Sequence, residues 1–266
     1  MPGWLGRTVD SSRMIEGDDK SFDSGRFSMS CRCLIFLLLI VAACVPQSST
    51  ALGQTIEDEG WWTAVFSQGD IAFAPNTPSR WRWWFDGHAR FQDNSDGFDV
   101  SIVRPGIGYK LTDHTTAWVG YGWIHTDPIG GGPEFDENRF WQQLTWSRQY
   151  GDFRIGLRPR FEQRLLTTGD DTGLRFRQFA SARAAISADK RLTMVLWDEV
   201  FIHLNDTDFG TWTGFNQNRA FFGFGWKPCP EETKSRIEIG YLNQFIESRS
   251  GRDRMNHLLA VNFFLQ

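Results

Sequence analysis

The sequence lacks any apolar run long enough for a transmembrane helix. Its longest such run, Leu34–Val45, has twelve residues, whereas a helix needs about 20 to cross a bilayer. Twelve residues suit the core of a secretory signal peptide, and Arg32 supplies the positive flank that precedes such a core. Ala51 and Gly53 place small residues at the two positions that a signal peptidase reads, so we expect cleavage before Gln54.

These features divide the chain into three segments. We expect residues 1–28 to be a mis-assigned or disordered extension upstream of the true start at Met29, residues 29–53 to be the signal peptide, and residues 54–266 to form one exported domain. Alternatively, Val41–Cys44 is a lipoprotein processing site in which Cys44 carries the lipid. The export signal, which has a bacterial pattern, implies a location in the cell envelope or outside the cell.

Cysteine and lysine are both scarce. Three of the four cysteines lie in the signal region, so cleavage leaves Cys229 alone and excludes an intrachain disulfide. The net charge of −4 gives no sign of a nucleic-acid partner. Only five basic residues are lysine and 23 are arginine, the residue better suited to crowded ion pairs because its planar fork donates several hydrogen bonds at once.

No helical periodicity follows Gln54, and the repeated pattern is the two-residue alternation of a β-strand. It is clearest in Arg80–Gln92, where apolar and polar side chains fall on opposite faces. The apolar face carries Trp81, Trp83, Phe85, Gly87, Ala89 and Phe91. The opposite face carries Arg82, Trp84, Asp86, His88, Arg90 and Gln92.

Eleven runs of this kind can be counted, many of them longer than the five to six residues usual for a globular strand. The expected fold is therefore all-β, a closed antiparallel transmembrane β-barrel. Because bacterial single-chain barrels have an even strand number, we expect about twelve strands, with ten as the alternative. A twelfth strand would lie near Gln54–Gly60 or Ile71–Ala74.

A membrane barrel explains these faces better than a soluble β-sandwich or a lipocalin-like barrel, which remain the alternatives. The polar face of a soluble sheet usually mixes Lys, Glu, Thr and Ser, whereas here it is rich in arginine. In lipid, strands must close so that every backbone group is paired; apolar residues then face lipid and polar residues face the lumen. Aromatic residues expected at the membrane interfaces are Trp61, Trp62, Trp81, Trp123, Trp226 and Tyr241.

The linkers between the runs alternate in length, as in outer-membrane barrels. Short ones are Leu111–Thr115, Tyr150–Phe153 and Ser187–Arg191, and longer ones are Thr126–Glu137, Thr167–Thr172, Asn205–Gln217 and Glu247–Arg254. If the C-terminus is periplasmic, the longer loops, which are rich in Asp and Glu, face outward.

Arginines on the inward faces are the strongest polar pattern in the chain. They are Arg82, Arg90, Arg139, Arg154, Arg158, Arg160, Arg164, Arg175, Arg177, Arg183, Arg219 and Arg236, and the inward carboxylates are Asp86, Glu162, Glu199 and Glu238. Side chains largely fill a narrow barrel, so we expect a lumen ion-pair network that holds a structural or small-solute barrel together. An anion-preferring channel is the first alternative, because uncompensated positive charge in a confined lumen attracts anions.

A lipid-modifying enzyme of the outer membrane is the second alternative. The chain has no Gly-x-Ser-x-Gly elbow, and no two histidines share a short motif. His257, which can face lipid near a strand end, is the only position to examine. We therefore expect no catalytic residues, no metal and no cofactor. The expected partners are outer-membrane lipid, lipopolysaccharide and the barrel-insertion machinery, with the protein acting as a monomer and binding no nucleic acid.

Several short clusters, in order along residues 60–266, resemble the family of outer-membrane barrels known as domain of unknown function 2490. The clusters are Arg104–Tyr109, Gly120–Tyr121, Arg139–Gln143, Arg158–Arg164, Asp198–Phe201, Asn216–Arg219 and Gly240–Gln244. The resemblance implies a barrel fold and an envelope location, and it implies no activity.

Overall fold

The protein is a closed β-barrel. The computed structural model describes residues 55–73, 79–92, 97–128, 132–228, 235–249 and 251–265, all within one compact unit. The expectations for residues 1–53 lie outside the described residues. Among those described, no helix is long and apolar enough to cross a bilayer.

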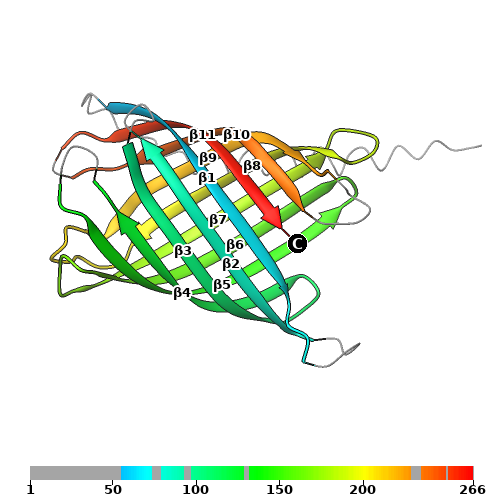
Figure 1. Ribbon diagram of the computed structural model, residues 1–266, viewed down its shortest axis with the longest axis horizontal. Helices are drawn as coiled ribbons and strands as arrows, with labels where there is room; N and C mark the ends of the chain where they lie inside the picture. Colours follow the sequence, from blue (N-terminus) through cyan, green and yellow to red (C-terminus); the bar gives the residue numbers. More distant parts are fainter. Residues whose placement is uncertain are drawn as a thin grey trace, which may run out of the picture. The chain divides into compact units, whose positions relative to one another are not determined.

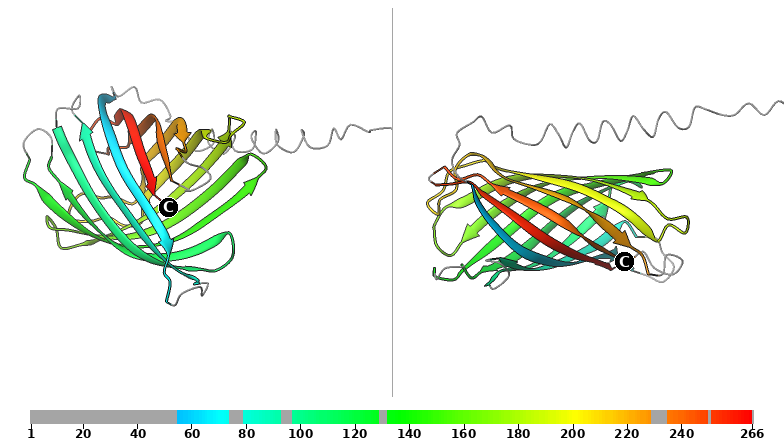
Figure 2. Two further views of the ribbon diagram at one scale, coloured as in Figure 1. Left: turned by 45° about the vertical axis from the view of Figure 1, so that its right-hand side comes forward. Right: turned by 90° about the horizontal axis from the view of Figure 1, so that it is seen from above.

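Eleven strands form the wall within the described residues, each hydrogen-bonded to two neighbours (Figure 1). They are β1 (Ile56–Asp70), β2 (Trp81–Gln92), β3 (Gly97–Lys110), β4 (Thr115–Thr126), β5 (Phe135–Tyr150), β6 (Phe153–Leu166), β7 (Thr172–Ala185), β8 (Leu192–His203), β9 (Gly214–Trp226), β10 (Arg236–Ile246) and β11 (Arg254–Leu265). Two further views show the tilted strands wrapping around a common interior (Figure 2).

The expected strand number, twelve or ten, is wrong, and so is the expectation of a fully antiparallel wall. Consecutive strands pair antiparallel, but β1 pairs with β11 in parallel, from Ile56 opposite Arg254 to Ser67 opposite Leu265. An odd number of up-and-down strands brings the first and last strands together in the same direction. A parallel ladder also satisfies the backbone groups of both edges, so closure does not require an even number. Of the segments suggested for a hidden strand, 56–60 begins β1, and 71–73 is not a strand.

The barrel has two ends, which we call the C-terminal rim, where β11 ends, and the opposite rim. Among the described residues between strands, 71–73, 79–80, 111–114, 151–152, 186–191, 227–228 and 235 lie at the C-terminal rim, and 127–128, 132–134, 167–171, 204–213, 247–249 and 251–253 lie at the opposite rim. The expected separation of short turns from long loops therefore holds only in part. β1 and β9 both end at the C-terminal rim, and the sequence that follows each of them before the next strand is long. Each of these two sequences contains two prolines, which cannot donate to a ladder.

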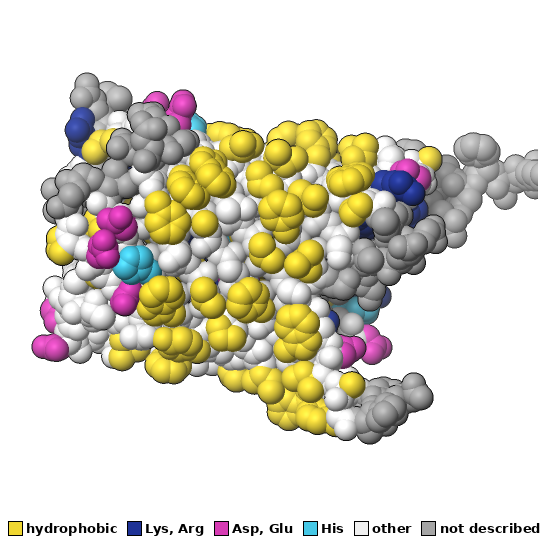
Figure 3. Space-filling view, viewed as in Figure 1, with side chains coloured by type: hydrophobic (Ala, Val, Ile, Leu, Met, Phe, Trp, Pro, Cys, Tyr) yellow, Lys and Arg dark blue, Asp and Glu magenta, His cyan; other side chains and the backbone are white. Residues whose placement is uncertain are grey.

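Alternation along each strand produces an apolar outer surface. On β9, Phe222, Phe224 and Trp226 are each 47–48% exposed, whereas Phe221 on the inward face is buried. Among the described residues, large exposed apolar side chains come from ten of the eleven strands, all except β7. On the face seen in Figure 3, hydrophobic side chains form a belt between the rims. Trp61, Trp81, Trp123, Trp226 and Tyr241 belong to this outer surface.

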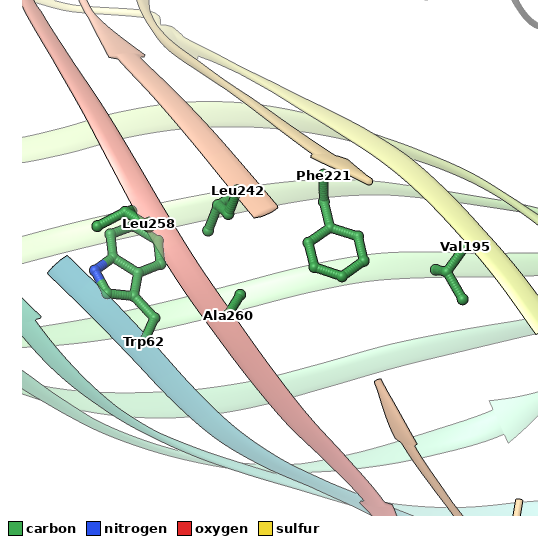
Figure 4. Packing of buried hydrophobic residues seen from close by; sticks show 6 residues of the cluster. All are labelled: Trp62, Val195, Phe221, Leu242, Leu258 and Ala260. Atoms are coloured by element: carbon green, nitrogen blue, oxygen red, sulfur yellow. The ribbon is translucent and has the colours of Figure 1, made fainter. Parts of the chain in front are cut away.

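The lumen holds packed side chains rather than a uniform polar lining. One wall carries a cluster of buried apolar residues (Figure 4), namely Trp62, Val195, Phe221, Leu242, Leu258 and Ala260. Trp62 is only 7% exposed, so its expected place at a membrane interface is wrong; the adjacent Trp61 faces outward instead. One residue of register decides between the two faces of a strand.

A second buried cluster joins Trp84, Trp118 and Trp141, whose rings meet edge to face. These rings fit inside the barrel because the facing positions are glycine: a Cβ atom at Gly108 would overlap the ring of Trp118, and one at Gly120 would overlap the ring of Trp141. Trp84, the large apolar residue on the polar face of the first run, is thus part of the lumen packing.

Candidate functional site

The site is built from charged side chains that point into the lumen from β5, β6, β7 and β8. Nine of them are joined by salt bridges, and we call them the central network. Its members are Glu137, Arg139, Arg158, Arg160, Glu162, Arg164, Arg175, Arg177 and Glu199.

Glu162 lies at the centre of this network and is 0% exposed. Its Oε2 accepts hydrogen bonds from two atoms of Arg175, Nε at 2.9 Å and Nη2 at 2.6 Å. Its Oε1 accepts one from Nη1 of Arg177 at 2.7 Å. Arg139 and Arg160 lie farther out, with nitrogens 3.9 and 3.7 Å from the carboxylate. Four guanidinium groups therefore share one buried carboxylate.

Two further carboxylates extend the network toward the two rims. Glu137 accepts from Arg139 Nε at 2.8 Å and from Arg164 Nε at 2.7 Å. Glu199 accepts hydrogen bonds from Nη2 of Arg177 at 2.8 Å and from Nη2 of Arg158 at 3.3 Å. The network thus holds six arginines and three glutamates, which leaves a net positive charge within the lumen.

Aromatic rings support the excess arginines. The guanidinium carbon of Arg160 lies 4.6 Å from the ring centre of Trp141, that of Arg177 lies 4.5 Å from Phe201, and that of Arg158 lies 4.5 Å from Phe179. A cation over the face of a ring is attracted by its quadrupole, and the attraction strengthens when water is excluded. The rings therefore add to the stabilisation of a network in which arginines outnumber carboxylates.

A separate group lies on β2 and β3 around Asp86, which is 0% exposed. Asp86 accepts hydrogen bonds from Trp84 Nε1 at 2.5 Å and from Arg104 Nε at 2.7 Å. The ring of His88 lies 2.7 Å from the same carboxylate. The polar face of the first run is therefore a small network of its own.

A third group bridges the lumen near the C-terminal rim. Glu238 on β10 pairs with Arg236 of its own strand at 2.7 Å and with Arg183 of β7 at 2.8 Å. Strands β7 and β10 are not neighbours in the wall, so the Arg183–Glu238 pair connects separate sides of the barrel.

The remaining expected network residues lie apart from these groups. Arg82 pairs with Asp70 at 2.9 Å, and Arg154 donates to Gln149 and Ser147. Arg90 on β2 and Arg219 on β9 both lie against the ring of Trp62, and their guanidinium carbons are 4.1 and 4.9 Å from its centre. The sixteen expected residues therefore divide among several groups rather than forming one network.

Sequence reasoning missed two important members, Arg104 and Glu137. Arg104 lies two and four residues before Gly106 and Gly108 on β3, and Glu137 lies two residues before Arg139 on β5. Residues an even number of positions apart share a face of a strand, so this spacing could have placed both side chains in the lumen. Glu137 directly follows Asp136, so the sequence predicts it in the acidic linker Thr126–Glu137, whereas in the structure it belongs to β5.

Carboxylates of the opposite rim hold the loops in place. Asp208 accepts from the backbone N–H groups of Asp170 at 2.8 Å and Asp171 at 3.3 Å, which ties linker 204–213 to linker 167–171. Hydrogen bonds from the backbone N–H and the hydroxyl of Thr213 lower the pKa of Asp206. Among the described residues, no group of three His, Cys, Asp or Glu side chains has the arrangement of a metal site.

His257 faces outward on β11. Its Nδ1 lies 2.6 Å from the hydroxyl of Tyr241, and the two rings stack with centres 6.0 Å apart. Asn243 donates to the same hydroxyl at 3.3 Å. This is a polar contact on the outer surface, away from the lumen groups.

Three comparisons relate the chain to known proteins. The family model described as "Protein of unknown function (DUF2490)" matches residues 59–256. A protein of Methylorubrum extorquens described as uncharacterized is 30% identical over 237 residues, covering 86% of this chain and 97% of the relative. LpxR from Salmonella typhimurium has 8% identity and a TM-score of 0.39, covering 71% of this chain and 83% of that one. A structural likeness of that size supports no inference about function.

Proposed function

We propose an envelope role for this chain, which belongs to the DUF2490 family of proteins of unknown function: it is a bacterial outer-membrane β-barrel whose lumen is closed by ion pairs. Its role is structural, or concerns small solutes that enter the lumen without crossing it. The partners that this location implies are outer-membrane lipid, lipopolysaccharide and the barrel-insertion machinery.

The observation that carries the proposal is the inverted arrangement of polar and apolar side chains. Phe140, Val119 and Leu259 are 50–53% exposed on the outer surface, while Glu162, Asp86 and Arg160 are at most 1% exposed inside. Soluble monomers rarely expose contiguous apolar patches larger than a few hundred Å². Lipid covers such a belt without cost, and the closed wall leaves no strand edge unpaired in the membrane.

The buried layer supports a closed lumen. Trp141 and Glu162 on β5 and β6 are 0% exposed, and Phe201 on β8 and Leu258 on β11 are each 1% exposed. Side chains from separate parts of the wall are thus out of contact with water at this level. We place the C-terminal rim in the periplasm, so that the carboxylate-rich linkers of the opposite rim face outward.

An anion-preferring channel is the second candidate, and the excess of arginine over glutamate in the central network favours it. Planar-bilayer conductance separates the two. We expect the refolded protein, with its insertion checked by flotation with lipid vesicles, to give no stepwise current in potassium chloride. Anion-selective current steps from the inserted protein would contradict the closed lumen and establish the channel.

A further inference from the structure

A cavity of about 710 Å³ lies in the lumen between the central network and the C-terminal rim. Its lining runs from Trp62 and Glu199 in the interior to His114 and Lys190 in rim linkers. We call it the basic vestibule. Arg158, Arg177 and Glu199 of the central network border it, and the turn residues in its lining show that it reaches the C-terminal rim.

Cations dominate this lining. Among the described residues it includes twelve Arg and Lys side chains and only four Asp and Glu side chains. Three of those four acids already have cationic partners: Glu199 pairs with Arg177 and Arg158, Glu238 with Arg183 and Arg236, and Asp152 with Lys190. Acids outside the lining pair with Arg82, Arg104 and Lys110. Four lining cations form no salt bridge among the described residues, namely Arg90, Arg154, Arg219 and Lys227, so the vestibule keeps an excess of positive charge.

Two arginines deep in the vestibule have donor groups to offer. Neither Arg90 nor Arg219 forms a salt bridge among the described residues, and the buried Nε of Arg90 has no hydrogen-bond partner there. The buried Nε of Arg158, which also lines the cavity, likewise has none. A buried donor without an acceptor costs free energy, and an anion in the vestibule would remove that cost.

The same wall is aromatic. Trp62 contacts both Arg90 and Arg219, Phe179 contacts Arg158, and Phe264 lies under Arg236 at 3.6 Å. Stacking fixes the planes of the guanidinium forks, which match phosphate oxygens in a bidentate manner. The exposed parts of these rings offer an apolar surface beside the charged donors.

We propose that the basic vestibule binds a small organophosphate, with its phosphate on Arg90, Arg219 and Arg158 and its apolar part against Trp62 and Phe179. A phosphate monoester suits the site better than a monocarboxylate because several guanidinium groups lack a counter-charge and a doubly charged group can serve more of them. This proposal requires only the folded barrel, so it holds or fails independently of the membrane location.

Calorimetric titration of the refolded full chain with phenyl phosphate tests the proposal. We expect saturable binding that is tighter than that of inorganic phosphate or phenylacetate and that weakens as salt is added. In the double variant R90Q/R219Q, binding should weaken about tenfold or more. Neither arginine forms a salt bridge among the described residues, so the variant breaks none and should fold. If it does not fold, the rim variant R154Q is measured in its place, and a smaller weakening is expected.

The matched control is R148Q. Arg148 is also a guanidinium beside an aromatic ring, 5.3 Å from Tyr150, but it lies outside the vestibule lining. No saturable binding of phenyl phosphate to the wild type, equal weakening in R148Q, or equally tight binding of inorganic phosphate or phenylacetate would overturn the proposal. A second experiment adds vesicles that contain phosphatidic acid to the titration with phenyl phosphate. If the vesicles compete with phenyl phosphate, the natural ligand is a lipid phosphate; if they do not, it is a soluble phosphate. Both results retain the phosphate site.

Discussion

Replacing Glu162 by glutamine is expected to destabilise the barrel by about 3–5 kcal/mol, the range for breaking a buried ion pair from one side. Glu162 is fully buried and accepts three hydrogen bonds from Arg175 and Arg177. The glutamine has a similar shape but no charge, so several buried guanidinium groups would lose their shared counter-charge. The measurement is the free energy of unfolding in urea of the protein inserted in lipid vesicles. The folded fraction at each urea concentration is read from the gel mobility of unboiled samples.

The control for Glu162 is E134Q at the opposite rim. The Glu134 side chain is 65% exposed and lies 3.6 Å from His125, and exposed pairs contribute about 0–1 kcal/mol. If E162Q is no less stable than E134Q, the central network does not hold the barrel together.

Placing arginine on the outer surface at Leu259 is expected to cost about 2–4 kcal/mol, as at the midplane of a membrane barrel. Leu259 is 52% exposed and is the sixth of twelve residues in β11, so it lies near the centre of the strand. A guanidinium there would have to leave water for lipid. The same unfolding measurement in vesicles reports the cost.

L111R is the matched control, because Leu111 is 47% exposed but follows the end of β3 at the C-terminal rim. Near the interface the expected cost falls to about 0–1 kcal/mol. In a soluble barrel both leucines face water and both substitutions are harmless. Equal stability of L259R and L111R would therefore argue against lipid at Leu259.

Most of the wall could be predicted from the sequence because strand alternation is a local property. The eleven runs correspond to the eleven strands, and residues such as Phe85 and Arg219 face the expected sides. How the wall closes is not local: the parallel contact of β1 with β11 joins residues about 200 positions apart. The count of eleven runs was therefore correct, and the expectation of ten or twelve strands was wrong because it followed the preference of bacterial barrels for even strand numbers.

The candidate site was less predictable, because alternation gives the face of a side chain but not its partner. Partners depend on register and on contacts across the lumen, such as Arg183 on β7 with Glu238 on β10. Register also decides the place of Trp61 and Trp62, since these adjacent tryptophans occupy opposite faces. The division of the charged residues into groups and the vestibule beside them required the folded structure.

The most direct test of the membrane account is fractionation of a Gram-negative host that expresses the full chain, followed by gel electrophoresis of unboiled and boiled samples. The account predicts that the protein is recovered with outer membranes and migrates faster unboiled, because a closed barrel stays compact in detergent until heat unfolds it. Recovery in a soluble fraction, with the same mobility before and after boiling, would contradict it.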